Sequence, residues 1–349
     1  MLDWFSGRVG YDASKLKTGS IISVSPEGEI EYSRDRWLKV KGSFESSVQL
    51  RRGTYNREML VDSERRGLVC SPICFEISGN PVKFLQGHNV FGPSVRMLEP
   101  IVRCFFRSLP IVHRPEGCEA DVWPALYSSR IDITEMIEFE SHQDVHDWIV
   151  VAGSMTRSRH GKAKTEGREL TAARTVYWGL GSRRWNLKAY CKCCELARHP
   201  VADLKLNDEL RSWCENQIRI ELCLRRPELK DIEQLDETLI FDYLSRIQVG
   251  VSNMTQNDRE SKLVAGAELC LRRWRDGVDV KVVYPRRTFY RYRRLILDEV
   301  GIDISLEVKD QKEAMKTAIK RDRFEVGFLK SRVVSEIPVR FQGLLLKPS

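Results

Sequence analysis

The chain has 349 residues, enough for two domains or one elaborated domain that buries its own core. Its formal net charge is +8, from 57 lysines and arginines against 49 acidic residues, which favours phosphate or nucleic acid as a partner. No apolar run approaches the ~18 residues that span a bilayer and no secretory h-region opens the chain, so we expect a cytoplasmic protein without a membrane segment.

Alternating apolar and polar residues predict strands, and spacings of three and four predict helices. The first 50 residues indicate strands and hairpins, and Pro227 ends the last clear strand. The fold class is therefore α+β, a mainly antiparallel central sheet backed by helices, with domains at 1–227 and 228–349, the second helical. Strands are expected near 73–78, 128–134, 187–192 and 218–225, and helices near 94–107, 141–151, 235–245, 259–274 and 287–300.

A group of three cysteines looks like a metal motif, with His199 as a lone neighbour. Cys191, Cys193 and Cys194 cluster, but a second pair at zinc spacing does not accompany them, so we interpret them as reduced thiols. His142 and His146 are spaced i, i+4 and share a helix face. We expect both at the surface, because no acidic or cysteine partner stands near them in the sequence.

A tyrosine stands between two lysines on the strand over 187–192. Lys188, Tyr190 and Lys192 fall on one face of that strand, with its apolar residues on the other. A phenol flanked by ammonium groups is suited to attack a phosphodiester, because the charges favour the phenolate and receive the phosphate. The alternative is an edge strand with solvated lysines and a surface tyrosine.

Three predicted strands carry a carboxylate opposite their apolar residues: Glu76, Asp132 and Glu221. Arg130 and Arg219 each precede an acidic residue by two positions, in the same phase. If the strands share a sheet, the carboxylates converge near the tyrosine and form a hard-oxygen site for Mg²⁺ or Mn²⁺. The alternative is a polar face that meets solvent or forms arginine–carboxylate pairs.

Other candidates are isolated. His88 follows a strand beside a glycine, which is compatible with a metal or phosphate role or with a structural one. Clustered arginines point to phosphate contacts, and those near the C-terminus alternate with aromatic residues that can stack on bases. The alternative there is a helix with an apolar face toward the core and arginines toward water. The candidate DNA-binding residues are Arg183, Arg184, Arg286, Arg287, Arg291 and Arg294.

Several motifs together resemble one family. Residues 83–92, Lys-Phe-Leu-Gln-Gly-His-Asn-Val-Phe-Gly, resemble a signature of the gene II replication initiators of filamentous bacteriophages. Residues 189–196 are similar to that family's tyrosine motif. One branch of the plasmid rolling-circle initiators carries Gly-Ser before its tyrosine strand, and Gly181-Ser182 stands in the matching place here. The chain lacks their His-hydrophobic-His metal pair, and the first 70 residues match poorly. Shorter similarities occur at 129–132, 219–221 and 284–292.

The resemblance implies a rolling-circle initiator, a metal-dependent site-specific endonuclease and strand transferase. It would nick one strand of the phage origin through a 5′-phosphotyrosine, free a 3′-OH primer and later rejoin the displaced strand. Residues 1–227 would form the nicking and joining domain and 228–349 the DNA-binding domain. The implied roles are Tyr190 as nucleophile, Lys192 as phosphate stabiliser, Asp132 and Glu221 as metal ligands, Glu76 or His88 as further ligands, and Glu195, Arg130 and Arg219 in support.

The expected partners are origin DNA, duplex and single-stranded, and a host helicase and polymerase, in the cytoplasm of the bacterial host. Assembly of an oligomer on the DNA is compatible with this role. Two alternatives stay open: a non-catalytic DNA-binding regulator of phage replication, and a metal-dependent nuclease that uses water as nucleophile. Only the nicking and joining enzyme predicts a covalent adduct on Tyr190.

Overall fold

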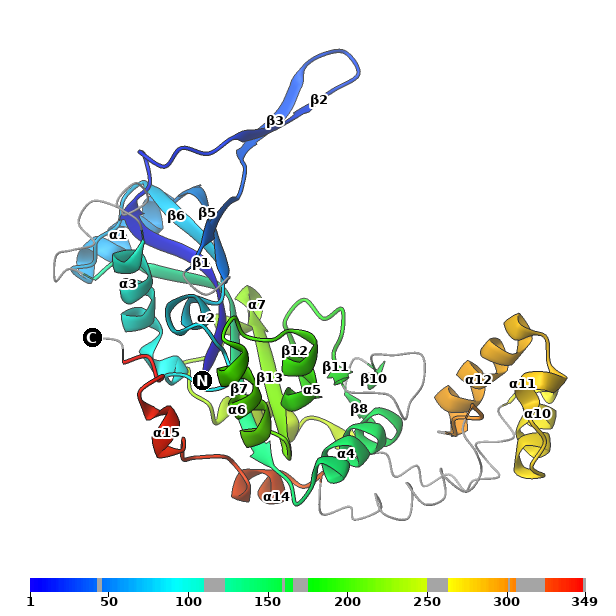
Figure 1. Cartoon of the computed structure of the whole chain (residues 1–349). Helices are drawn as coiled ribbons and strands as arrows, with labels where there is room; N and C mark the ends of the chain where they lie inside the picture. Colours follow the sequence, from blue (N-terminus) through cyan, green and yellow to red (C-terminus); the bar gives the residue numbers. More distant parts are fainter. Residues whose placement is uncertain are drawn as a thin grey trace.

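The protein is built on one large antiparallel sheet, as the computed structural model in Figure 1 shows. The structure describes residues 1–42, 46–109, 123–158, 161–165, 175–249, 263–300, 302–305 and 324–347. The sheet has the strand order β10-β11-β12-β13-β7-β1-β6-β5-β4, and each neighbouring pair is antiparallel. Its strands are β1 (Leu2–Asp12), β4 (Leu38–Lys41), β5 (Ser47–Thr54), β6 (Ile73–Gly79), β7 (Leu126–Glu138), β10 (Lys164–Thr165), β11 (Thr175–Trp178), β12 (Trp185–Cys191) and β13 (Gln217–Arg225).

Helices pack around this sheet, and the predicted α+β class is confirmed. Two smaller sheets pair β2 (Ser20–Val24) with β3 (Ile30–Asp35), and β14 (Gln248–Val249) with β8 (Thr156–Ser158) and β9 (Gly161–Lys162). The helices are α1 (Arg57–Arg65), α2 (Pro81–Gln86), α3 (Leu98–Ser108), α4 (His142–Met155), α5 (Lys192–Arg198), α6 (Leu204–Trp213), α7 (Arg226–Leu229), α8 (Leu239–Leu244), α10 (Ala265–Arg275), α11 (Val280–Val283), α12 (Arg286–Val300), α14 (Val326–Ser331) and α15 (Val339–Gln342), with a 3₁₀ turn at Val95–Met97.

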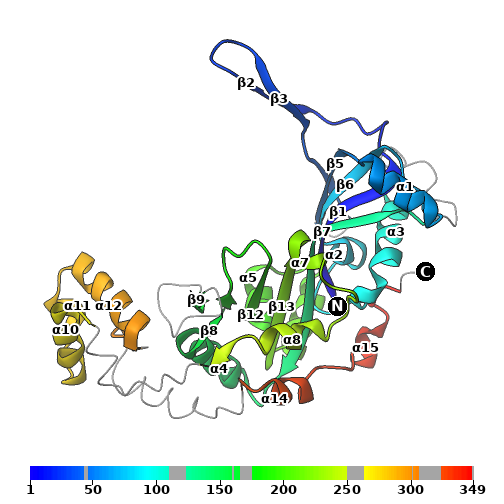
Figure 2. The same cartoon turned by 180° about the vertical axis from the view of Figure 1, so that it is seen from behind.

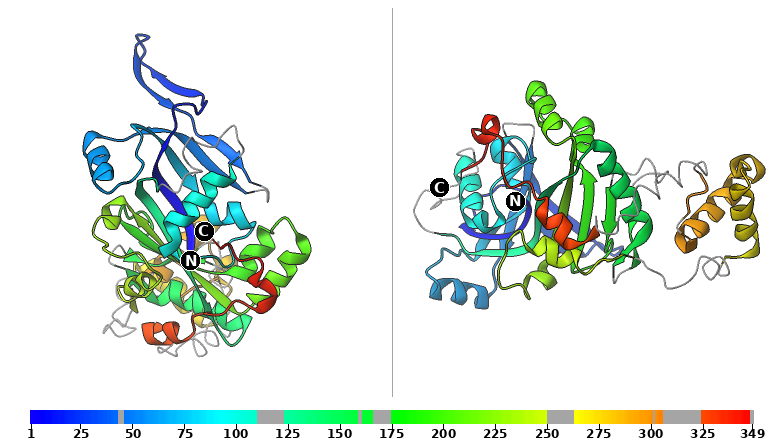
Figure 3. Two further views of the ribbon diagram at one scale, coloured as in Figure 1. Left: turned by 90° about the vertical axis from the view of Figure 1, so that its left-hand side faces the viewer. Right: turned by 90° about the horizontal axis from the view of Figure 1, so that it is seen from below.

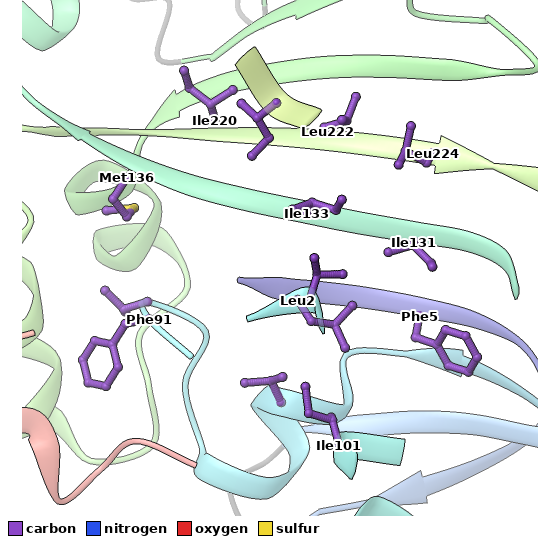
Figure 4. Close-up of a cluster of buried hydrophobic side chains, with 14 of the residues drawn as sticks. Leu2, Phe5, Phe91, Ile101, Ile131, Ile133, Met136, Ile220, Leu222 and Leu224 are labelled. Atoms are coloured by element: carbon purple, nitrogen blue, oxygen red, sulfur yellow. The ribbon is translucent and has the colours of Figure 1, made fainter. Parts of the chain in front are cut away.

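One face of the sheet forms the core. Alternate residues of β1, β7 and β13 point the same way and are buried together, as Figure 4 shows for Leu2, Ile133 and Leu222. Aromatic contacts tie helices to this face. Trp148 of α4 meets Trp178 of β11 with ring centroids 6.3 Å apart, and Tyr243 of α8 meets Trp185 of β12 at 5.0 Å. Polar side chains are therefore left for the opposite face.

The last part of the chain contributes to two hydrophobic clusters. Hydrophobic residues within 263–300 and 302–304 form their own cluster, in which Trp274 of α10 and Phe289 of α12 are buried. Leu329 of α14 and Phe341 of α15 instead belong to the core of the large sheet, and Figures 2 and 3 show these helices beside it. The division at residue 227 stays a prediction, and the clusters add that the chain returns to the first core after α12.

Two surface features complete the fold. The hairpin of β2 and β3 projects from the sheet in Figure 1, and its Ile22 and Ile30 are exposed. None of the helices in the described ranges is long and apolar enough to cross a membrane.

Candidate active site

Tyr190 lies on β12 among charged side chains of both signs. Only 7% of its surface is exposed. The Nζ atoms of Lys188 and Lys192 lie 4.6 Å and 6.0 Å from the centroid of its ring. Opposite Tyr190 on β13 stands Arg219, which is wholly buried. The phenol is therefore packed among three cations, as a group that must meet a phosphate would be.

Burial sets the protonation state of this phenol. Desolvation raises the pKa of Tyr190 well above its usual value, and the opposing effect of Arg219 does not cancel it. Burial therefore outweighs the cationic charge that the sequence led us to expect would favour the phenolate. The hydroxyl stays neutral until something else, such as a bound phosphate, changes its surroundings.

Lys192 reaches the tyrosine from a helix. The prediction that it lies on the same strand as Tyr190 is wrong, because β12 ends at Cys191 and α5 begins at Lys192. Its Nζ donates to Oδ1 of Asn89 at 3.1 Å and to Oε2 of Glu195 at 2.7 Å. Burial and Arg219 lower the pKa of this ammonium. The residue is thus fixed beside the ring, with Glu195 as the supporting partner predicted for it.

Asp132 and Glu221 lie on the tyrosine's face of the sheet. Lys188, opposite Glu221, places its Nζ 2.8 Å from Oε2 of that residue, and Arg130 Nε lies 2.8 Å from Oδ1 of Asp132. Burial raises the pKa of both carboxyl groups, and the charge of Asp3 raises each pKa further. The buried carboxylates of Asp132, Glu221 and Asp3 thus repel one another on this face, and each is paired with a cation.

Asp3 is a site residue that the sequence did not reveal. A register shift in the pairing of β1 with β7 falls between Leu2 and Trp4, and Asp3 lies on the polar face there. Its Oδ1 accepts from Arg219 Nη2, from Asn80 Nδ2 and from Asn89 Nδ2, each at 2.9 Å. Burial raises the pKa of Asp3, but Arg219 and other neighbours bring it below its usual value.

Glu76 and His88 lie apart from the two central carboxylates. Glu76 is on β6, separated from β7 by β1, and binds Arg8 at 3.1 Å and Arg51 at 2.5 Å. His88 is 1% exposed in the loop after α2, with Nε2 unpaired among the described residues. Desolvation, then Lys192 and Arg219, lower its pKa to about 4. Their role as additional metal ligands stays a prediction.

The loop that carries His88 is held from within. Gly87, at φ +87°, ends α2 in the left-handed conformation that favours glycine. Gln86 Nε2 then donates to the carbonyls of His88 at 3.1 Å and Phe91 at 2.6 Å. The backbone carbonyl of Asn89 accepts from Arg219 Nη1. The motif at 83–92 thus braces Arg219 and Lys192 rather than meeting the tyrosine itself.

The predicted DNA-binding arginines are exposed, in two places. Arg183 and Arg184 occupy the turn between β11 and β12, where Arg184 binds Glu228 at 2.5 Å and also pairs with Asp231. On α12, Phe289 and Ile296 are buried, and the arginines lie on the exposed side, as either reading of this helix requires. The exposed arginines of α12 are Arg286, Arg287, Arg291 and Arg294.

The interpretation of His142 and His146 as isolated surface residues is wrong. Both are half-buried on α4 and approach Cys191 and Cys194, to which their Nε2 atoms come within 3.3 to 3.6 Å. Among the described residues, this is the one set of three or more His, Cys, Asp or Glu whose ligand atoms all lie within 4.8 Å. The sequence shows the spacing within the histidine pair and within the cysteine pair. It does not show that the two pairs meet, because His146 and Cys191 are 45 residues apart.

The chain is similar in sequence to replication-associated proteins of bacteriophages. The family model for the N-terminal part of the phage replication-associated protein, the gene II product, matches residues 1–253. The replication-associated protein of Enterobacteria phage I2-2 is 29% identical over 324 residues, which cover 88% of this chain and 89% of that protein. The replication-associated protein of Enterobacteria phage f1 is 30% identical over 160 residues, 45% of this chain and 36% of its own.

A solved rolling-circle replication initiator protein from Geobacillus stearothermophilus covers 74% of this chain and 89% of its own, at 12% identity and a TM-score of 0.33, a similarity that carries no argument. The sequence matches define a phage replication protein on an α+β fold, the class that the motifs predicted. The chain belongs to the family of the replication-associated gene II proteins of filamentous phages. That family model includes the first 70 residues, where the motifs alone showed little similarity.

Proposed function

We propose that the protein nicks one strand of the phage origin with Tyr190 as nucleophile and later rejoins the displaced strand. The observation that carries this proposal is the enclosure of Tyr190 by Lys188, Lys192 and Arg219 on a sheet face that also holds buried carboxylates. Family membership supports the replication role. The similarity of residues 189–196 to the tyrosine motif of the phage initiators supports the nicking step.

The reaction would exchange one ester for another. The Tyr190 oxygen forms a bond to phosphorus and the bond to the 3′-oxygen breaks, so the phenol loses one proton and the new 3′-hydroxyl gains one. Because the free phenol is neutral, the cations act mainly as negative charge develops on the two oxygens and on the phosphate. The phosphotyrosine retains the ester's energy, so the joining step needs no ATP.

We further propose that Asp132 and Glu221 hold Mg²⁺ or Mn²⁺. Their oxygens match the ligands that these ions prefer, and a dication would offset the charge of Asp3, which adds to the effect of burial in raising both pKa values. Such an ion polarises the scissile phosphate. Arg130 and Lys188, which now neutralise the two carboxylates, would then turn toward the DNA phosphate.

The partners follow from this chemistry. Origin DNA, single-stranded at the nick and duplex beside it, is the substrate that a tyrosine on the polar sheet face would take. We propose that the exposed arginines of α12 bind its backbone. A host polymerase to extend the 3′-hydroxyl and a helicase to displace the strand remain part of the proposal.

A covalent adduct tests the nucleophile. The purified chain is incubated with supercoiled DNA carrying the phage origin and with Mg²⁺, the DNA is digested, and peptides are analysed by mass spectrometry. We expect a nucleotide on the Tyr190 peptide and no nicking by Tyr190→Phe. Tyr177→Phe is the matched control, because Tyr177 stands opposite Lys188 on β11 and is the rival phenol of this face.

Each alternative has its own outcome in this assay. Nicking by Tyr190→Phe at the wild-type rate would refute the assignment. Metal-dependent cutting without any adduct would indicate a water nucleophile. DNA binding without nicking under any divalent metal would favour the regulator.

A further inference from the structure

A cluster of two histidines and two cysteines lies on the other side of the Tyr190 strand. Tyr190 and Cys191 are consecutive on β12, so their side chains point to opposite faces of the sheet. Cys191 points toward α4, where His142 and His146 are one turn apart. Cys194, in the first turn of α5, is the fourth member. Strand, helix and turn thus deliver four ligand atoms to one point.

The separations within the cluster match a tetrahedral metal site. Bond lengths of ~2.3 Å to sulfur and ~2.05 Å to nitrogen give edges of about 3.3 Å between nitrogens and about 3.6 Å between nitrogen and sulfur. The two histidine Nε2 atoms are 3.0 Å apart. Nε2 of His142 lies 3.3 Å from Cys191 Sγ and 3.6 Å from Cys194 Sγ, and Nε2 of His146 lies 3.5 Å from Cys194 Sγ.

Thiol–imidazole hydrogen bonding alone explains these contacts less well. Two adjacent imidazole Nε2 atoms can share a single hydrogen bond, but here both nitrogens also approach the same sulfur. A central cation satisfies all four atoms at once. The sequence has the corresponding spacings, His-x₃-His on α4 and Cys-x₂-Cys across the start of α5, which are typical of zinc ligands.

We propose that His142, His146, Cys191 and Cys194 bind one structural zinc ion. Two sulfur and two nitrogen ligands select zinc over Mg²⁺ or Mn²⁺, so this ion is different in kind from the one proposed for Asp132 and Glu221. Four protein ligands leave no position for water or substrate, as in structural sites. Cys191 and Cys194 are 1% and 7% exposed, and the histidines are half-buried, so the site is closed to solvent on most sides.

The position of the cluster indicates a structural role for the ion. It would connect α4 to the junction where β12 ends and α5 begins, which is where Tyr190 and Lys192 stand two residues apart. Tyr190 is one residue from a ligand and on the opposite face. The ion would therefore fix the orientation of the tyrosine without touching the DNA.

Metal analysis of the full-length protein tests this site. The protein is expressed with zinc, purified without chelator and measured by plasma mass spectrometry, and the apoprotein is titrated with Co²⁺. We expect about one zinc per chain and the visible absorption of thiolate-bound tetrahedral cobalt. Cys194→Ser and His146→Asn should each lower Co²⁺ affinity at least about 100-fold. Cys193→Ser is the matched control, a cysteine in the same turn of α5 that lies outside the cluster.

The wild-type result keeps the proposal falsifiable even if a variant does not fold. A wild-type protein with no zinc, and with no thiolate–cobalt absorption on titration, would refute the site. So would Cys193→Ser losing the metal while Cys194→Ser keeps it. Melting temperature gives a second measurement independent of nicking, since zinc removal should lower it in wild type and leave Cys194→Ser unchanged.

Discussion

Asp3 and Arg219 form a buried ion pair, with Oδ1 and Nη2 2.9 Å apart, although 216 residues separate them in the sequence. The pair joins the first strand of the chain to the strand beside the tyrosine. Arg219 also donates to Thr134 Oγ1 at 3.1 Å and to the Asn89 carbonyl. One guanidinium therefore links β1, β7, β13 and the loop after α2.

Replacing Asp3 by asparagine should destabilise the fold strongly. Asp3→Asn leaves Arg219 buried without its counter-charge, and breaking such a pair costs about 3–5 kcal/mol. Urea denaturation measures the change in the free energy of unfolding. Asp12→Asn is the control, the same substitution at the exposed end of the same strand, expected within about 0.5 kcal/mol of wild type. A loss below about 1 kcal/mol in Asp3→Asn would show that the pair contributes little.

His88 should make stability depend on pH. Its pKa is about 4 in the fold against 6.5 in a free side chain, so between these values the unfolded chain binds the proton and the fold does not. Stability should fall as pH falls through this window, by about 2–3 kcal/mol between pH 7.5 and 4.5 for this residue.

The comparison that isolates this effect is between wild type and His88→Asn, both measured by urea denaturation across that range. Between pH 7.5 and 4.5, His88→Asn should lose about 2–3 kcal/mol less unfolding free energy than wild type does. This difference does not depend on the stability of the variant at neutral pH. His199→Asn, at the exposed end of α5, is the control. Equal pH slopes for wild type and His88→Asn would contradict the burial of a neutral imidazole.

Glu221 and Glu76 should differ in their effect on nicking. Loss of a metal ligand removes several kcal/mol of transition-state stabilisation, so Glu221→Gln should slow Mg²⁺-dependent nicking by at least about 100-fold. Glu76→Gln should stay near wild type, because Glu76 is held by Arg8 and Arg51 two strands from β7. Initial nicking rates across a Mg²⁺ titration decide. An equal loss of nicking rate in both variants would indicate that Glu76 is also a metal ligand.

The arginines of α12 should control the salt dependence of DNA binding. Each phosphate contact contributes about 0.9 to the slope of log affinity against log salt, so changing Arg286, Arg287, Arg291 and Arg294 to glutamine should reduce the slope by about 3–4. Fluorescence anisotropy with an origin duplex at several salt concentrations measures it. Lys281→Gln on α11 is the control, an exposed cation of the same helical cluster outside the predicted set. An unchanged slope would remove α12 from the interface.

The sequence predicted what depends on local pattern. Alternation placed Asp132 and Glu221 on the polar sides of their strands, and the family motif around Tyr190 identified the strand of interest. Asp3 was missed because a β-bulge breaks the alternation that would have placed it. The relation of His142 and His146 to Cys191 was missed because it depends on how α4 packs against β12, which spacing along the chain does not reveal.

The place of β1 in the sheet has a consequence for synthesis. β1 is made first, yet it lies between β7 and β6, and its partner across the site is on β13. Contacts so distant in sequence form late in folding. A ribosome that has released only the first 200 residues has delivered Tyr190 but neither Arg219 nor Glu221. An incomplete nascent chain therefore carries Tyr190 without its guanidinium, and the nicking proposed for this tyrosine would require that β13 has been translated.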